Sequence, residues 1–134
     1  MNSLVDHLDH LVLTTRDIVK CLDFYTRVLG MTVEPFGAGR IALKYGQQKI
    51  NVDETSRTFG PLPDQPTPGS LDLCFIGAFP LDRVVAHLKK EGAEIELGPV
   101  PRTGAIYGLT SIYLRDPDGN LIEISERAGD GSTI

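Results

Sequence analysis

The sequence predicts an α+β protein made of two β-α-β-β-β modules, whose mixed sheets curl to form a cleft. An internal repeat is the first sign, because His10-Leu-Val-Leu13 is echoed by Ser70-Leu-Asp-Leu73, and Ile50-Asn-Val52 by Ile122-Glu-Ile124. The length of 134 residues, 41% of them hydrophobic, allows one well-buried core but not two ordinary domains. We therefore expect a single domain over residues 1–134, with module one at 7–53, a linker at 54–69 and module two at 70–127.

Module one begins with alternating apolar residues that predict a strand over residues 8–14. Apolar residues then recur at intervals of three and four from Ile18 to Leu29, which predicts a helix. Asp17 is placed to cap its beginning, and Gly30 to end it in a left-handed conformation. Short strands are expected next, joined by glycine turns, at 31–36, 40–45 and 48–53.

The segment 54–69 is rich in proline and lacks apolar periodicity, so it is predicted to be a linker. Module two then repeats the order of module one, with a helix between Pro80 and Gly92. Its predicted strands cover residues 71–76, 94–100, 111–115 and 121–126. Asp116-Pro-Asp-Gly119 is typical of a tight turn between the last two strands.

Composition and charge exclude several classes of function. The net charge of −5 and the scattered Lys and Arg residues argue against a nucleic-acid partner. No apolar stretch approaches the roughly 20 residues that span a bilayer, and the first residues lack a signal-peptide layout. We therefore expect a cytoplasmic protein that does not bind membranes, with Cys21 and Cys74 reduced and buried.

Alternation along the strands predicts a polar surface opposite the core. If apolar neighbours such as Ile122 and Ile124 face the helices, Glu123 and Ser125 must face away. The same rule gives the residues expected to line the cleft: His10, Asn51, Ser70, Asp72 and Glu123. An imidazole and a carboxylate are good ligands for a divalent ion at neutral pH, although two ligands alone would bind weakly.

Several motifs resemble those of the vicinal oxygen chelate superfamily, which contains glyoxalase I, bleomycin-resistance proteins and extradiol dioxygenases. The resemblance runs from Leu8 to Glu126. The motifs are Asp9-His-Leu-Val-Leu13, Phe24-Tyr25, Val28-Leu-Gly-Met31 and Arg115-Asp-Pro-Asp-Gly-Asn-Leu-Ile-Glu-Ile124. Gly98-Pro-Val-Pro-Arg-Thr-Gly104 with Ser111-Ile-Tyr113 looks closest to the branch called glyoxalase domain-containing protein 5.

The resemblance implies a divalent metal site and a catalytic carboxylate. The family's first-strand ligand matches His10, and its last-strand glutamate, which moves a proton in glyoxalase-type enzymes, matches Glu123. The two other ligand positions match Asn51 and Ser70, which are weaker donors than the family's His and Glu. Asp72 could replace Ser70 if the ion moves along the strand by about 6 to 7 Å. That set suits Mn²⁺, Fe²⁺ or Mg²⁺, with Ni²⁺ and Zn²⁺ as further alternatives.

Two residues of module two are candidates for substrate binding. Arg102 is expected in a loop rich in proline and glycine, where its guanidinium could receive an anionic group. Tyr113 shares an alternating face with Ser111 and could present its hydroxyl to the cleft. The family also implies a homodimer.

Two classes of function compete on these residues. The first is a metal-dependent, glyoxalase-like lyase or isomerase acting on a small oxygenated substrate. The second is a non-catalytic protein that binds a small molecule or antibiotic, as the bleomycin-resistance branch does. His10 and Glu123 favour the enzyme. An extradiol dioxygenase is less favoured, because it needs two histidines and one carboxylate.

Overall fold

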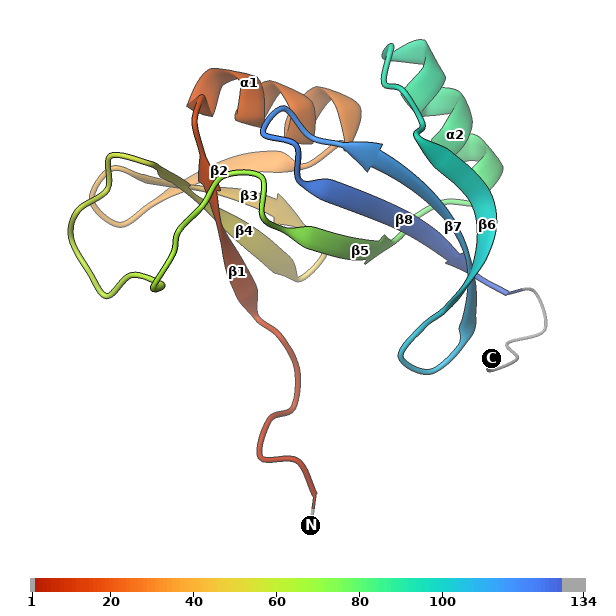
Figure 1. Cartoon of the computed structure of the whole chain (residues 1–134), viewed down its shortest axis with the longest axis horizontal. Helices are drawn as coiled ribbons and strands as arrows, with labels where there is room; N and C mark the ends of the chain where they lie inside the picture. Colours follow the sequence, from red (N-terminus) through yellow and green to blue (C-terminus); the bar gives the residue numbers. More distant parts are fainter. Residues whose placement is uncertain (1, 129–134) are drawn as a thin grey trace. The chain divides into compact units, whose positions relative to one another are not determined.

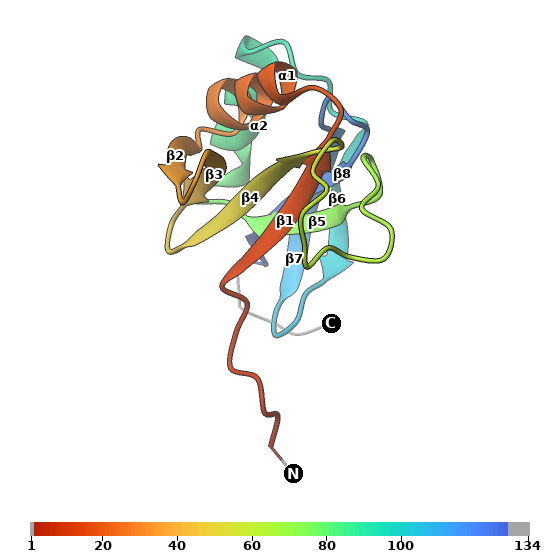
Figure 2. The ribbon, with the colours of Figure 1, turned by 90° about the vertical axis from the view of Figure 1, so that its left-hand side faces the viewer.

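The computed structural model describes residues 2–128 and divides the chain into two compact units, Met1–Pro68 and Gly69–Ile134. Each unit contains a four-stranded mixed sheet, drawn in Figures 1 and 2. The strand order is β1-β4-β3-β2 in unit one and β5-β8-β7-β6 in unit two, so the second order repeats the first. The predicted α+β fold with two β-α-β-β-β modules is confirmed.

Unit one follows the predicted order, with small changes at the element ends. Its first strand pairs in parallel with its last, and the remaining pairs are antiparallel. The elements are β1 (His10–Thr15), α1 (Ile18–Asp23), η1 (Phe24–Val28), β2 (Thr32–Phe36), β3 (Arg40–Tyr45) and β4 (Gln48–Glu54).

The helix of unit one differs from the regular helix predicted up to Leu29, because its second half, η1, is a π-helix. The Asp17 side chain accepts a hydrogen bond from the Lys20 amide, as expected of an N-cap. Further on, the Thr26 hydroxyl donates to the Leu22 carbonyl at 2.7 Å, a side-chain bond that competes with the regular backbone ladder. The wider turn buries Phe24 beside Tyr25, with their rings edge to face.

Unit two repeats the plan of unit one and contains β5 (Asp72–Ile76), α2 (Leu81–Lys90), β6 (Leu97–Thr103), β7 (Gly108–Arg115) and β8 (Leu121–Arg127). The strand predicted over residues 94–100 is shifted toward the C-terminus. Because β7 begins at Gly108, its residues pair with β6 as far as Thr103. The register of this pair shifts between Leu97 and Val100. Arg102 therefore lies in a strand, and its predicted place in a loop was wrong.

The core faces match the predicted alternation. Leu13, Ile50 and Ile122 are buried, whereas His10 and Val12 are exposed. The Asp116 carboxylate accepts from two backbone amides of its turn, which supports the predicted hairpin. Within residues 2–128, no helix is long and apolar enough to cross a membrane.

The two cysteines differ from the prediction in one respect. Neither forms a disulfide, and Cys21 is buried as expected. Cys74, however, is exposed. It lies on the face of β5 that points away from the core, so the expectation that it is buried was wrong.

Candidate functional site

Glu123 lies at the end of a chain of hydrogen bonds on the non-core face of the unit-two sheet. The Ser125 hydroxyl donates to Glu123 Oε2 at 3.3 Å. Ser111 Oγ lies 2.6 Å from Ser125 Oγ, and Cys74 Sγ lies 3.3 Å from it. Ser125 has a single proton, which it gives to the carboxylate, so Ser111 donates to Ser125. The chain of donors therefore ends on Glu123.

Strand pairing explains why these residues meet. Glu123 on β8 has Cys74 of β5 and Tyr113 of β7 as its direct neighbours in register. The next position on the same face pairs Ser125 with Ser111. Both serines are fully buried, whereas Glu123 is half-buried. The carboxylate thus combines a fixed hydrogen-bond donor with access to solvent.

Arg102 and Tyr113, the two predicted substrate-binding residues, contact each other. Arg102 Nε donates to the Tyr113 hydroxyl at 2.8 Å, and Nη1 donates to the Pro101 carbonyl at 2.8 Å. A guanidinium can only donate hydrogen bonds, so the Tyr113 oxygen accepts from Arg102 through one of its lone pairs. The Tyr113 proton is therefore left to bond another acceptor on this face.

The pKa of the Cys74 thiol depends on its burial and on the charge of Glu123. Desolvation raises the pKa of Cys74 even though the residue as a whole is exposed, and the hydrogen bond with Ser125 opposes this. The negative charge of Glu123 and its hydrogen bond with the thiol raise the pKa further. The thiol therefore stays protonated and can remain a donor at neutral pH.

His10, the predicted metal ligand of unit one, is exposed at the start of β1. Its Nδ1 lies 2.9 Å from Asp9 Oδ1, and this hydrogen bond is the main cause that lowers the pKa of Asp9. Metal-binding histidines commonly use one ring nitrogen for a carboxylate and the other for the ion. His10 has this arrangement, although its carboxylate partner is exposed.

Asn51, at the repeat position of Glu123, is in a different environment. It is only 3% exposed, and its Oδ1 has no hydrogen-bond partner among residues 2–128. The Phe36 ring lies on the same face of the sheet, with Lys49 Nζ at 3.8 Å and Arg40 Cζ at 4.9 Å from its centre. An unpaired buried amide oxygen is costly and could accept from a ligand or coordinate a cation.

The register of the sheets corrects one equivalence suggested by the sequence repeat. Leu11 pairs with Ile50 in unit one, and Leu73 pairs with Ile122 in unit two. The counterpart of His10 is therefore Asp72, which precedes Leu73, and not Ser70. Ser70 is exposed and precedes β5.

The corrected repeat positions carry His10 and Asn51 in unit one, and Asp72 and Glu123 in unit two. One imidazole, two carboxylates and an amide oxygen are suitable donor types for a divalent ion. Across the described part of the chain, however, no three His, Cys, Asp or Glu side chains are grouped closely enough to hold a metal. The donor types suit a divalent ion, and each unit supplies two of them.

Sequence reasoning missed several residues of the two polar faces. Ser111 and Ser125 were placed on the correct face but not recognised as partners of Glu123. The available signal was their spacing, because Ser125 follows Glu123 by two residues and Ser111 precedes Tyr113 by two residues on the paired strands. In unit one, it missed that Asp53 binds both Arg40 and Arg57. The four-residue spacing of Asp53 and Arg57 could have suggested part of this contact.

The duplicated β-α-β-β-β plan, with a polar non-core face in each unit, defines the structural class of the chain. Within that class, the chain belongs to the glyoxalase/bleomycin resistance protein/dioxygenase superfamily, whose model matches residues 7–124. It is 50% identical over 123 residues to virulence protein STM3117 of Salmonella typhimurium, covering 92% of this chain and 85% of that protein.

Two further relatives extend the comparison. Glyoxalase domain-containing protein RDO1 of Mycosarcoma maydis is 50% identical over 121 residues, which cover 90% of this chain and 68% of that protein. An integron cassette protein of V. cholerae is 48% identical, with a TM-score of 0.91 over 96% of this chain and 100% of that one. None of these names specifies a reaction.

More distant structures share the fold. Lactoylglutathione lyase from Agrobacterium tumefaciens has a TM-score of 0.70 at 22% identity, covering 91% of this chain and 94% of that one. TnmS3, an antibiotic-binding protein from Streptomyces, has a TM-score of 0.71 at 21% identity, covering 95% and 100%. The fold therefore accommodates both catalysis and binding.

Proposed function

We propose that this protein is a glyoxalase-like enzyme that moves a proton on a small oxygenated substrate, with Glu123 as the catalytic base. The observation that carries the proposal is the hydrogen-bond chain from Ser111 through Ser125 to the Glu123 carboxylate, on a strand position paired with Tyr113. A fixed, half-buried carboxylate next to a hydroxyl donor is suited to proton transfer beside a carbonyl group.

The proposed step is the isomerisation of an α-hydroxycarbonyl compound, or of the hemithioacetal of a 2-oxoaldehyde, which contains the same group. Glu123 removes the proton from the hydroxyl-bearing carbon, the electron pair of that bond forms a carbon–carbon double bond, and the carbonyl electron pair moves to the carbonyl oxygen. Tyr113 donates a hydrogen bond to this oxygen while Arg102 holds the phenol. The protonated Glu123 then returns its proton to the former carbonyl carbon, and the hydroxyl proton of the first carbon passes to the oxygen of the former carbonyl. The carbonyl has then moved by one carbon, and the Glu123 carboxylate is regenerated.

The superfamily also implies a divalent metal, for which His10, Asn51, Asp72 and Glu123 are the proposed donors. When bound, such an ion would polarise substrate oxygens as a Lewis acid. Titration of the parent protein, His10→Ala and Glu123→Gln with Mn²⁺, Ni²⁺ and Zn²⁺ tests this donor set by calorimetry. We expect weak binding that both substitutions abolish, and equal binding by all three proteins would contradict the assignment.

Proton transfer can be tested without knowing the physiological substrate. A panel of hydroxycarbonyl compounds and hemithioacetals is incubated with protein in D₂O, and loss of the carbon-bound proton signal is followed by ¹H NMR. We expect exchange that Glu123→Gln slows by about 10²- to 10⁴-fold, the usual contribution of a general base. Glu126→Gln, which changes an exposed glutamate of the same strand, is the control and should retain the parent rate.

A non-catalytic binding protein is the second candidate. The unpaired Oδ1 of Asn51 supports it, because a neutral acceptor at the repeat position of a catalytic glutamate suits ligand binding better than proton transfer. The likeness of the fold to an antibiotic-binding protein is compatible with this alternative. Saturable binding of a panel compound without any proton exchange would favour it over the enzyme.

A further inference from the structure

We infer that unit one contains a second site, which binds an oxyanion, a carboxylate or phosphate group of a small ligand, through Arg57. The site is a pocket with an empty volume of about 200 Å³, including its opening to solvent. It is formed by the ends of β1 and β4 and by the segment that follows β4. The lining residues are Thr14, Asp53, Glu54, Thr55, Arg57, Leu62 and Pro66.

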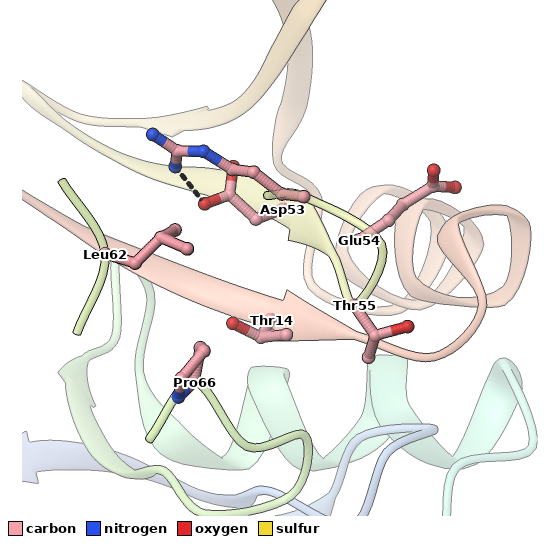
Figure 3. Close-up of a pocket in the computed structure, with 7 residues that line it drawn as sticks. Thr14, Asp53, Glu54, Thr55, Leu62 and Pro66 are labelled. Atoms are coloured by element: carbon pink, nitrogen blue, oxygen red, sulfur yellow. Dashed lines mark hydrogen bonds and ion pairs between the residues drawn. The ribbon is translucent and has the colours of Figure 1, made fainter. Parts of the chain in front are cut away.

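The pocket has a polar side and an apolar side. Figure 3 shows Leu62 and Pro66 on one side of it, and Thr14 and Asp53 on strands of the sheet. Thr14 is the register partner of Asp53, so the hydroxyl and the carboxylate come from adjacent strands. A ligand with a charged group and a short apolar part matches these walls.

Arg57 is held in place by three contacts. Its backbone amide donates to the Glu54 carbonyl at 3.1 Å, which turns the chain back toward the sheet. Its Nη1 donates to Asp53 Oδ2, and its Cζ lies 4.6 Å from the centre of the Phe59 ring. The side chain is only 15% exposed. A guanidinium fixed in this way loses little further freedom when it binds an anion.

The hydrogen-bonding capacity of Arg57 is not fully used. Its Nε is buried and has no partner among residues 2–128. A buried N–H of a charged group that lacks an acceptor is unfavourable, and an oxyanion supplies both the acceptor and the opposite charge. The unpaired Nε in the lining of a pocket is the observation that points to a ligand.

The ion-pair cluster at one wall of the pocket carries a net positive charge. Asp53 is surrounded by two arginines, since Arg40 Nη2 donates to its other oxygen at 3.1 Å. This cluster has two positive charges and one negative charge. Glu54 is exposed, and its carboxylate points away from Asp53 in Figure 3, so solvent screens its charge.

The inference is tested by titrating the full chain with inorganic phosphate, and separately with acetate, at constant ionic strength set with chloride. The Arg57 Nε–Hε signal is followed in ¹⁵N-resolved NMR spectra. We expect a saturable shift with at least one of the two anions, and the anion that binds more tightly distinguishes a phosphate site from a carboxylate site. Absence of a saturable shift with both anions would overturn the inference.

Variants separate the pocket from general charge effects. Arg57→Lys keeps the charge but removes the Nε donor, and it should weaken binding at least about tenfold, as expected for a charge-assisted hydrogen bond. Thr14→Val removes the pocket hydroxyl while leaving the ion pairs intact, and it should weaken binding less. Arg27→Lys is the matched control, because Arg27 pairs with Asp23 at the same four-residue spacing on the exposed helix. Equal affinity in Arg57→Lys and the parent would contradict the site.

Discussion

Units one and two share their strand order but use their non-core faces differently. In unit two, the last strand presents Glu123, which is half-buried and hydrogen-bonded to Ser125. In unit one, the equivalent strand presents Asn51, which is buried with an unpaired oxygen, and then Asp53 between two arginines. The same strand order thus supports a potential base in one unit and an ion-pair cluster in the other, because the residues on the polar face differ.

The largest expected effect concerns the activity proposed for unit two. Tyr113→Phe removes the hydroxyl donor and should slow proton exchange by about 10²-fold, as loss of one oxyanion donor usually does. Exchange measured by NMR in D₂O checks this. Tyr107→Phe is the control, because Tyr107 lies in the same unit and also stacks with an arginine, Arg127. Equal losses in both variants would show that Tyr113 has no special role.

The ion-pair cluster of unit one should matter chiefly for stability. Asp53→Asn leaves two arginines without their shared carboxylate, and the side chain is only 9% exposed. We expect the free energy of unfolding to fall by about 2 to 4 kcal/mol, measured by urea denaturation. Asp23→Asn breaks an exposed pair at the same spacing and should hardly move the midpoint. Similar midpoints for the two variants would contradict the buried character of the cluster.

Substitution of buried asparagines sharpens the contrast between an unpaired amide and a paired one. Asn51→Leu removes an oxygen without a partner and should raise the free energy of unfolding by about 1 kcal/mol. Asn120→Leu should lower it by about 2 to 3 kcal/mol, because Asn120 bonds both the Leu71 amide and the Asp116 carboxylate. A loss of stability in both variants would show that Asn51 has a partner in solution.

The smallest effect uses Cys74 as a probe of the charge on Glu123. Burial is the first cause that raises the pKa of Cys74, and Glu123 adds to it through its charge and a hydrogen bond. Glu123→Gln removes these contributions, so the pKa should fall and more thiolate should be present at pH 8. Alkylation by iodoacetamide should then become faster by a few-fold, because the thiolate is the reactive form. An unchanged rate would place the Glu123 carboxylate too far away to act on the thiol.

Much of the fold was predictable because it depends on local patterns. Alternation placed Glu123 and Ser125 opposite the core, and the Asp17 cap and the turn at Asp116 have short-range chemical signatures. The helix prediction failed at η1, where the Thr26 hydroxyl bonds a helix carbonyl. The strand containing Arg102 was misplaced because its extent depends on its partner β7.

The candidate site was predicted only in part. Glu123 and Tyr113 were chosen individually, and their adjacency follows from strand pairing. The partners of Glu123 were missed because alternation gives the face of each serine but not the strand register that brings Ser111 to Ser125. Arg57 was missed because it lies in a segment expected to be a linker, although that segment returns to the sheet and contacts Asp53.

The sequence by itself determined the duplicated β-α-β-β-β plan and the residues on each face, because both depend on periodicities within single elements. The tertiary structure decided which of those residues are partners. A shift of two residues between neighbouring strands keeps every side chain on its face, so alternation could not distinguish Ser70 from Asp72 as the counterpart of His10. Backbone pairing between strands distant in sequence fixed that register and gave Glu123 its hydrogen-bonded neighbours, whereas the Asn51 Oδ1 has no partner among residues 2–128.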